Sequence, residues 1–379
     1  AVSLTPEPFP GVSSEPVSAV VVVFSEAIDP LSLTPAGLSL RRDGGDDLID
    51  AAVAVVPEAP TRFRVSGLSA ATEGAYVFAV DLGAVRDLAG NPGVGPAEVS
   101  WRLDTTPPAL PAGLAVVPDT GLSESDGITS TAVLTVQAVL AENGLTVRLH
   151  DETADRPLGV AVVAGTAVAL PVNLIHPGLN RLRLTAVDAA GNAAAAFFDV
   201  FVDPLPPEVT GLADQAAPQR QVTWSWGAAD ADSQVRWRAR VDTDPSGVPT
   251  GEYDSTTSAS QNDGDGLHYL HVQAIDRAGN ASPVTTVSAL LDNTPPAAPV
   301  VTGPAVDHSG MPTWSWSSGG LDGAGTYRWR LDNDDLETES TLTTATAWTP
   351  TVPLPEGVHT LYVQERDAAG NWSSTGSLE

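Results

Sequence analysis

The 379-residue chain contains no cysteine and no lysine, so all 18 of its basic residues are arginine. Without cysteine it can form no disulfide, no thiolate nucleophile and no cysteine-ligated zinc site. Without lysine it can form no Schiff base, no phosphate-loop lysine contact and no lysine–asparagine isopeptide crosslink. These two absences exclude many classes of enzyme before any motif is considered.

Basic charge and long apolar runs are also scarce. The chain carries 47 acidic residues and a formal net charge of −29. Such a surface repels phosphate backbones and anionic lipid, which excludes nucleic acid as a partner. The apolar stretches, such as residues 17–24, fall short of the roughly 20 residues that a membrane helix needs. We therefore expect no membrane insertion of this segment.

A five-residue motif, Asp-x-Ala-Gly-Asn, recurs along the chain. Its asparagines are spaced by 101, 88 and 91 residues. Near-constant spacing of this length is typical of repeated domains. The copies are Asp87–Asn91, Asp188–Asn192, Asp276–Asn280 and Asp367–Asn371.

Each of the first three motifs is followed by an aspartate and then a pair of prolines. Two successive prolines remove two N–H donors and favour extended geometry, which ends a sheet and makes a short, stiff connector. The connecting aspartates are Asp104, Asp203 and Asp292. The sequence therefore predicts four domains, at 1–104, 105–203, 204–292 and 293–379. The first is divergent, and the last is a close copy of the third, with a last strand that we expect to be shortened.

Within each repeat, apolar residues alternate with polar ones and turn residues recur every 8 to 12 positions, which is typical of β-sandwiches. In the third repeat, Val235, Trp237, Ala239 and Val241 would line one face of a strand, with three arginines on the other. No helical periodicity is convincing. The sequence predicts an all-β chain of tandem Ig-like or fibronectin-III-like β-sandwiches in an elongated array.

The motif and the Asp-Thr-Thr-Pro-Pro linker at Asp104–Pro108 together resemble the bacterial immunoglobulin-like repeats of large surface proteins and adhesins. The segment Asp119–Thr129 is similar to the opening of their adhesin-type repeats. The first domain, with Val20–Pro30, is more similar to Ig-like domains attached to bacterial surface-layer proteins. The resemblance implies a bacterial extracellular or cell-surface array whose modules act as spacers, adhesive units or ligand-binding modules.

The repeated acidic motif has two interpretations. In the first it is a tight turn, in which glycine takes positive φ, the aspartate caps backbone N–H groups, and Asn91, Asn192, Asn280 and Asn371 have a structural role. In the second, motif and linker carboxylates together bind Ca²⁺ at the domain junctions, because calcium requires six to eight oxygen ligands. Calcium at such junctions is also what the resemblance implies. The candidate ligands are Asp104, Asp188, Asp203, Asp276, Asp292 and Asp367.

A further acidic segment, Asp242 to Gly247, matches the first half of a calcium-binding loop. Position twelve of that loop requires a bidentate glutamate. Here that position is Tyr253. We therefore favour a turn with solvated carboxylates over a divalent-ion site.

The nine tryptophans suggest a second hypothesis, in which sugar rings of a glycan stack on exposed indole rings. Most are expected in the cores, because Ig-type sandwiches bury one or two large aromatics each. The pairs Trp224/Trp226 and Trp314/Trp316 share a strand face. Trp348 and Trp372 lie near predicted turns and are the candidates for glycan stacking.

Catalytic motifs are lacking. Only two of the six histidines, His268 and His271, are close in sequence, and their spacing of three places them on opposite strand faces. His268 and His359 occupy equivalent repeat positions, which indicates a structural role.

We therefore predict a non-enzymatic adhesin stalk, spacer or adhesion module. Its partners would be a cell-surface glycan or protein and the neighbouring repeats of the same chain, with Ca²⁺ as the one suggested cofactor. The alternatives are a carbohydrate-binding accessory region of a secreted protein and a self-assembling surface-layer or filament subunit.

Overall fold

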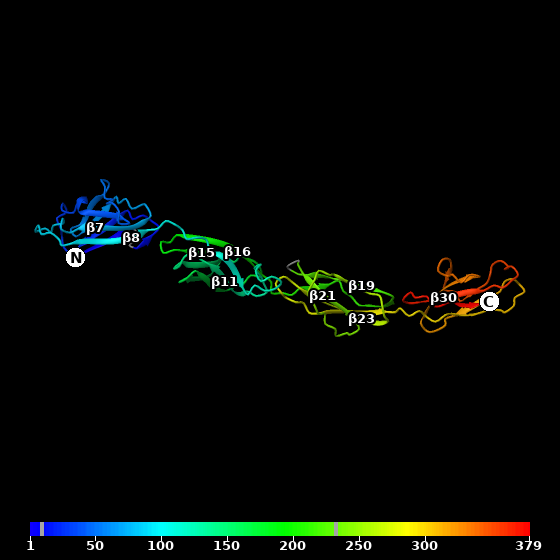
Figure 1. The fold of residues 1–379 in the computed structure, drawn as a ribbon. Helices are drawn as coiled ribbons and strands as arrows, with labels where there is room; N and C mark the ends of the chain where they lie inside the picture. The colour runs from blue at the N-terminus through cyan, green and yellow to red at the C-terminus, as the bar shows by residue number, and fades with distance from the viewer. Residues whose placement is uncertain (8–10, 231–233) are drawn as a thin grey trace. The chain divides into compact units, whose positions relative to one another are not determined.

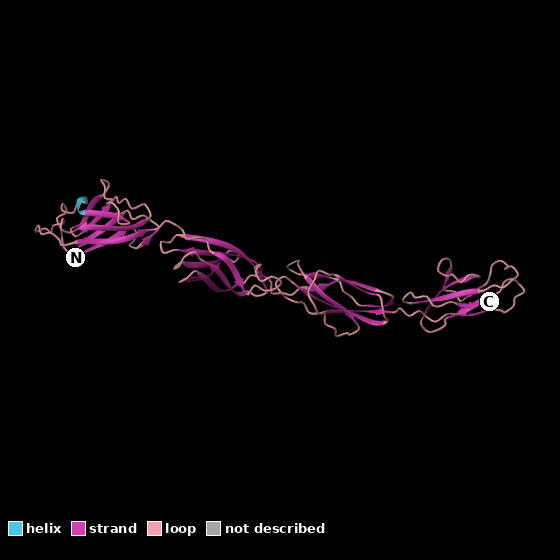
Figure 2. Cartoon of the chain, viewed as in Figure 1, coloured by secondary structure: helices cyan, strands magenta, loops and turns pink. Residues whose placement is uncertain are grey.

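The chain is built of β-strands and loops, as Figure 2 shows, with one short 3₁₀ helix at Pro35–Gly37. The computed structural model describes residues 1–7, 11–230 and 234–379. It divides into two compact units, Ala1–Pro204 and Leu205–Glu379. Within these described ranges, no helix has the length and apolar character needed to cross a membrane. The predicted all-β class is confirmed.

The first sandwich packs two sheets of order β1-β3-β6-β5 and β2-β8-β7-β4 around one hydrophobic core. This is the constant-type immunoglobulin arrangement, with β1 and β2 as two halves of the first strand. Along β7 the side chains of Tyr76, Phe78 and Val80 alternate into the core. Its strands are β1 (Val2–Glu7), β2 (Val12–Ser13), β3 (Ala19–Phe24), β4 (Leu38–Arg42), β5 (Ala54–Ala59), β6 (Arg62–Ser66), β7 (Gly74–Asp81) and β8 (Pro96–Leu103).

The second sandwich has sheets of order β14-β11-β9 and β10-β16-β15-β12-β13, with a second separate core between them. Here β13 pairs with β12 in the same sheet, as in fibronectin type III domains. Figure 1 labels β11, β15 and β16. Its strands are β9 (Ala112–Val117), β10 (Ile128–Thr129), β11 (Val133–Val139), β12 (Thr146–Asp151), β13 (Arg156–Val162), β14 (Ala167–Asn173), β15 (Gly178–Val187) and β16 (Ala193–Val202).

The third sandwich places β18-β24-β23-β21 against the short pairs β17-β20 and β19-β22. Trp224, Trp226 and Trp237 fill its core, as the sequence predicts. Val235 and Val241 pack partly against that core, whereas Ala239 is exposed. Its strands are β17 (Glu208–Thr210), β18 (Gln215–Gln219), β19 (Val222–Ser225), β20 (Gly227–Ala229), β21 (Arg236–Asp242), β22 (Ser258–Gln261), β23 (Gly266–Ile275) and β24 (Thr285–Leu291).

The fourth sandwich combines sheets β25-β26-β29 and β28-β27-β30-β31. Trp314, Trp316 and Tyr327 lie in its core. Its last strand is short and pairs only with Leu361–Val363 of β30. Its strands are β25 (Val300–Thr302), β26 (Trp314–Ser317), β27 (Gly323–Leu331), β28 (Thr341–Thr343), β29 (Ala347–Trp348), β30 (Leu361–Asp367) and β31 (Gly376–Leu378).

In three sandwiches, a polar side chain near the start of the next-to-last strand (β7, β15 or β30) hydrogen-bonds to a backbone carbonyl four residues upstream. The Tyr76 hydroxyl donates to the carbonyl of Thr72, four residues upstream. The Asn180 amide donates to the His176 carbonyl at 2.9 Å, also four residues upstream. His359 Nε2 donates to the Pro355 carbonyl at 3.0 Å. This corner is a hallmark of immunoglobulin-like folds when the residue is tyrosine.

Candidate functional site at the repeated turn and linker

All four copies of the motif adopt the same turn. In the first copy, the Asp87 N–H donates to the Asn91 carbonyl at 3.0 Å, and the Asn91 N–H donates to Asp87 Oδ1 at 2.9 Å. The Asn91 side-chain amide donates to Asp87 Oδ2 at 2.8 Å. These bonds, the side-chain bond first, lower the pKa of the Asp87 carboxyl below its ordinary value. Both carboxylate oxygens are therefore engaged inside the turn.

The same bonds recur between the first and last residues of the other three copies. The glycine of each copy has a φ between 87° and 98°, a conformation that favours glycine. The predicted turn geometry of Asn91, Asn192, Asn280 and Asn371 is thus present at each position.

In the first unit, the motif asparagine also binds the linker. Asn192 Nδ2 donates to the backbone carbonyl of Asp104 at 2.8 Å, across 88 residues of sequence. The N–H of Asp104 donates to the carbonyl of Ser13 at 2.9 Å, at the end of β2. The linker aspartate is therefore held on one side by the first sandwich and on the other by the second. We call this arrangement the linker tie.

The second unit contains the same linker tie. Asn371 Nδ2 donates to the Asp292 carbonyl at 2.8 Å, and the Asp292 N–H donates to the Gln219 carbonyl at 3.0 Å. Asn371 is buried, so its amide needs these partners. Because two junctions in separate units share the geometry, the tie is a property of the repeat.

The linker is fixed further by an acidic residue at the loop before the penultimate strand. Glu73 Oε2 accepts hydrogen bonds from the hydroxyls of Thr105 and Thr106, at 3.3 and 2.8 Å. In the third sandwich, Asp265 Oδ1 accepts from the Asn293 N–H at 2.6 Å, and Asp265 Oδ2 accepts from the Thr294 hydroxyl. Sequence reasoning did not assign these acceptors to the linker, although an acidic residue directly precedes the first glycine of β7 and of β23.

The predicted calcium ligands at these two junctions accept hydrogen bonds within their own turns, as Asp276 also does from Asn280. Asp104 Oδ1 accepts from the Thr106 N–H at 3.3 Å, and Asp292 Oδ1 accepts from the Thr294 N–H at 3.2 Å. Asp188 and Asp367 bind their motif asparagines. Among the described residues, these four carboxylates join no group of three or more acidic or histidine side chains close enough to share a metal ion.

The remaining two predicted ligands, Asp203 and Asp276, are both buried. Asp203 directly follows β16 in the first unit, and its N–H donates to the Thr129 carbonyl at 2.9 Å. In the second unit, Asp276 begins the third motif, and one of its carboxylate oxygens lies within 4.8 Å of an oxygen of Asp230. Two carboxylates this close repel each other unless a cation or a proton lies between them.

The segment that matches half a calcium loop folds over a buried histidine. His271 is fully buried, and its Nε2 donates to the Asp244 carbonyl at 2.9 Å and lies 3.3 Å from Asp242 Oδ1. Backbone N–H groups of Asp244 and Ser246 bind the carboxylates of Asp242 and Asp244. The segment is thus a hydrogen-bonded turn that covers His271, a role that its sequence did not reveal.

The two tryptophans predicted to bind glycans are both partly buried. Trp348 is stacked on Trp314 at a centroid distance of 5.7 Å and packs on Trp329 at 4.5 Å. Trp372 lies beside two guanidinium groups, with the Cζ atoms of Arg328 and Arg366 at 4.5 and 5.6 Å from its ring centroid. A glycan that stacks on either ring would therefore have to compete with these aromatic and cation–π contacts.

No protein-family model and no curated protein sequence matches the chain. Solved structures do. A tetra-tandem repeat from the extending region of a large adhesion protein covers 100% of this chain and 99% of its own length, at 16% identity and a TM-score of 0.32.

Two other similar structures contain fibronectin(III)-like modules and titin domains, respectively. The modules, from CbhA of Clostridium thermocellum, cover 47% of this chain and 94% of their own, at 17% identity and a TM-score of 0.29. Titin domains A168–A170 cover 71% of this chain and 97% of their own, at 15% identity and a TM-score of 0.32.

The strand order of each sheet defines the class of protein. The first sandwich has the strand order of immunoglobulin domains. In the second sandwich β13 pairs with β12, and in the fourth β28 pairs with β27, as in fibronectin type III domains. The chain is a tandem series of immunoglobulin-like and fibronectin-III-like β-sandwiches.

Proposed function

We propose that the chain is a non-enzymatic extracellular spacer or stalk that holds a binding surface away from a cell, and that the linker ties set the stiffness of its junctions. The observation that carries this proposal is the repeated hydrogen bond from a motif asparagine to the carbonyl of the preceding linker aspartate. A flexible tether would not need Asp104 and Asp292 to be bound from both sides. We propose domain boundaries at 1–104, 105–203, 204–292 and 293–379.

The acidic surface supports an extracellular, bacterial cell-surface role, because a net charge of −29 keeps repeated modules soluble and mutually repelling. Adhesion to a glycan or protein partner is the finer part of this proposal. Trp348 and Trp372 are the glycan candidates, and the neighbouring repeats are partners within the chain.

Calcium stiffening is proposed at one place, the third motif, because Asp230 and Asp276 bring two carboxylate oxygens within 4.8 Å. Calcium would need four or more further oxygens there, from backbone carbonyls, other side chains or water. The ion would neutralise the pair and hold the turn in place.

The linker tie is tested by replacing Asn192 and Asn371 together with alanine in the full chain. We expect small-angle scattering to report a broader distribution of particle dimensions, because two linker carbonyls lose their side-chain partner. The matched control is Asn91→Ala, since the contacts described for Asn91 stay inside its own turn. If the double variant scatters like wild type and the control, the ties do not set stiffness and the spacer proposal loses its support.

A further inference from the structure

A cavity of about 190 Å³ opens in the third sandwich between β21 and β22, which are edge strands of its two facing layers. Ala239 and Val241 of β21 line one side, and Ala259 of β22 lines the other. Ala239 is exposed, although it lies two residues after Trp237 and therefore on the strand face that points to the core. The cavity thus lies where the strand pattern predicts a core side chain.

Ala259 stands where the fourth sandwich has a tryptophan. In the third sandwich β19 pairs with β22 through Trp224↔Ala259, and in the fourth β26 pairs with β29 through Trp314↔Trp348. Trp224 and Trp314 each begin a Trp-Ser-Trp segment. Ala259 is therefore the repeat equivalent of Trp348.

Ala239 also stands where the fourth sandwich has a tryptophan. Ala239 pairs with Val272, and Trp329 pairs with Val363. Each valine directly precedes a glutamine, and an arginine directly precedes Ala239 and Trp329. In both sandwiches the Nε of this arginine donates to the glutamine side chain, at 2.9 and 2.7 Å. The two positions are therefore equivalent.

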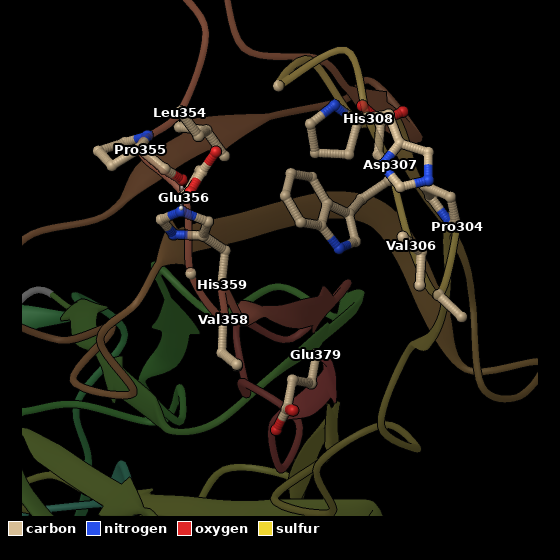
Figure 3. A pocket seen from close by; sticks show the side chains of 15 residues that line it. Pro304, Val306, Asp307, His308, Leu354, Pro355, Glu356, Val358, His359 and Glu379 are labelled. Carbon is tan, nitrogen blue, oxygen red and sulfur yellow. Dashed lines mark hydrogen bonds between the residues drawn. The ribbon is translucent and has the colours of Figure 1, made fainter.

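In the fourth sandwich, indole rings fill this place. Trp348 packs on Trp329 at a centroid distance of 4.5 Å and is stacked on Trp314 at 5.7 Å. A cavity of the fourth sandwich lies elsewhere, between 304–308 and 354–359 (Figure 3), and the residues described around it include neither Trp329 nor Trp348. The cavity of the third sandwich therefore corresponds to two indole rings replaced by two methyl groups.

Backbone hydrogen bonds hold the walls of the cavity in place. The Trp237 N–H donates to the Asp254 carbonyl at 2.8 Å, and the Asp254 N–H donates to the Trp237 carbonyl at 2.7 Å. The Trp226 N–H donates to the Thr257 carbonyl at 3.0 Å. Because these bonds fix both sides, the walls do not close over the space that the alanines leave. An unfilled space of this kind costs stability, and a ligand that fills it recovers part of that cost.

The size and the polar groups of the cavity indicate what it holds. An apolar cavity of about 150 Å³ can hold a benzene ring. Oxygen acceptors come from Asp254, Thr256 and Ser258, which are exposed and line the cavity. The hydrogen bond from the Thr256 N–H lowers the pKa of the Asp254 carboxyl, so this acceptor is ionised at neutral pH. Arg240, which also lines the cavity, is paired with Asp242 at 2.7 Å.

We propose that this cavity binds an aromatic ring of indole size that carries an N–H or O–H donor. The ring lies between Ala239 and Ala259, in the place that Trp329 and Trp348 fill in the fourth sandwich, and its donor binds the Asp254 carboxylate. A free heteroaromatic molecule and the tryptophan side chain of a partner protein share this chemistry. Aromatic side chains seated in such pockets are the usual anchors of protein interfaces.

The first test titrates the full chain with indole and follows the methyl resonances of Ala239 and Ala259 by NMR. We expect both resonances to shift, with a dissociation constant of about 1 mM or below, as is ordinary for a ligand of so few atoms. Resonances that stay unmoved up to the solubility limit of indole would overturn the proposal.

A second ligand distinguishes the two sources of the ring. N-acetyl-tryptophanamide carries the indole on a peptide backbone. Binding as tight as that of indole assigns the cavity to a partner's tryptophan, whereas binding of indole alone assigns it to a small molecule. The donor is tested with 1-methylindole, which we expect to bind several-fold more weakly than indole. Equal affinity of these two would overturn the contact with Asp254.

The chain variant Ala259→Trp fills the cavity as Trp348 does in the fourth sandwich. We expect it to weaken indole binding at least tenfold without lowering the melting temperature of the third sandwich. Ala217→Trp is the matched control, because Ala217 is exposed on β18 and does not line the cavity. If Ala259→Trp melts at a lower temperature, Ala239→Trp provides the same test from the other wall. Undiminished binding to a folded variant would show that indole binds elsewhere.

Discussion

At the scale of single residues, the motif asparagine can donate three hydrogen bonds through two groups, its backbone N–H and its side-chain amide. Its backbone N–H and its amide bind the two oxygens of one aspartate, and in Asn192 and Asn371 the same amide also reaches a linker carbonyl. Aspartate would lack the amide donor, and glutamine would place it one carbon farther out. The turn itself follows from sequence, because glycine and asparagine favour the conformations that it requires. The linker tie does not, since its partners are 88 and 79 residues apart.

Gly247 allows a residue-scale prediction about the turn over His271. A β-carbon at this position would lie 2.5 Å from His271 Nε2 and 2.7 Å from Asp242 Oδ2. Gly247→Ala should therefore destabilise the third sandwich by about 1–3 kcal/mol, as overpacking typically does. Chemical denaturation followed by tryptophan fluorescence measures this loss. Gly159→Ala is the matched control, because nothing lies within 4 Å of a β-carbon there; equal stability of the two variants would contradict the packing.

At the scale of strands, period-two patterning predicted the sheets but not every face. In β21 the alternation correctly places Trp237 inside. It places Ala239 inside as well, yet Ala239 is exposed. His268 and His271 lie at opposite-face spacing in β23, but both are buried because the turn at Asp242–Gly247 covers the second face. The alternation of apolar and polar residues along a strand predicts which side chains share a face. Whether a face is buried also depends on which loop covers it.

We expect the corner residue His359, two residues before β30, to make stability dependent on pH. His359 donates to the Asp332 carboxylate at 2.7 Å and to the Pro355 carbonyl at 3.0 Å. Both partners only accept, so both imidazole nitrogens carry protons in this geometry. The Asp332 hydrogen bond, followed by that of Pro355, raises the pKa of His359 above its ordinary value of 6.5.

A raised pKa in the folded state means that the contribution is fully present below pH 6.5 and is lost as pH rises through the folded-state pKa. We therefore expect the fourth sandwich to melt at a lower temperature at pH 9 than at pH 6. Melts of His359→Gln across this range provide the comparison. A wild-type pH dependence as steep as that of the variant would contradict the role of His359.

At the scale of the whole molecule, acidic charge dominates every module, and arginine is the only strongly basic side chain. Like charges destabilise compact states, and salt screens them over about 10 Å at 0.1 M. Composition alone shows this property and predicts that nucleic acid is not a partner. The sequence also predicted sandwiches, because turn residues punctuate each repeat.

A comparison of Na⁺ with Ca²⁺ distinguishes the screening of acidic charge from the specific binding of an ion. Raising NaCl from 20 to 500 mM should raise the melting temperature of the full chain, because repulsion is screened. We expect 1 mM Ca²⁺ to raise it further than NaCl of equal ionic strength, through Asp230 and Asp276. Asp276→Asn together with Asp230→Asn should remove only the calcium increment. If calcium and matched NaCl act alike, the ion merely screens charge.

The parallel pairing of the short strands in the first three sandwiches has a mechanical consequence. β2 pairs in parallel with β8, β10 with β16, and β18 with β24. When the chain is pulled from its ends, the hydrogen bonds of such a pair are sheared together and must break at once. Under tension, each of these three sandwiches should therefore resist extension until the hydrogen bonds of its parallel pair break.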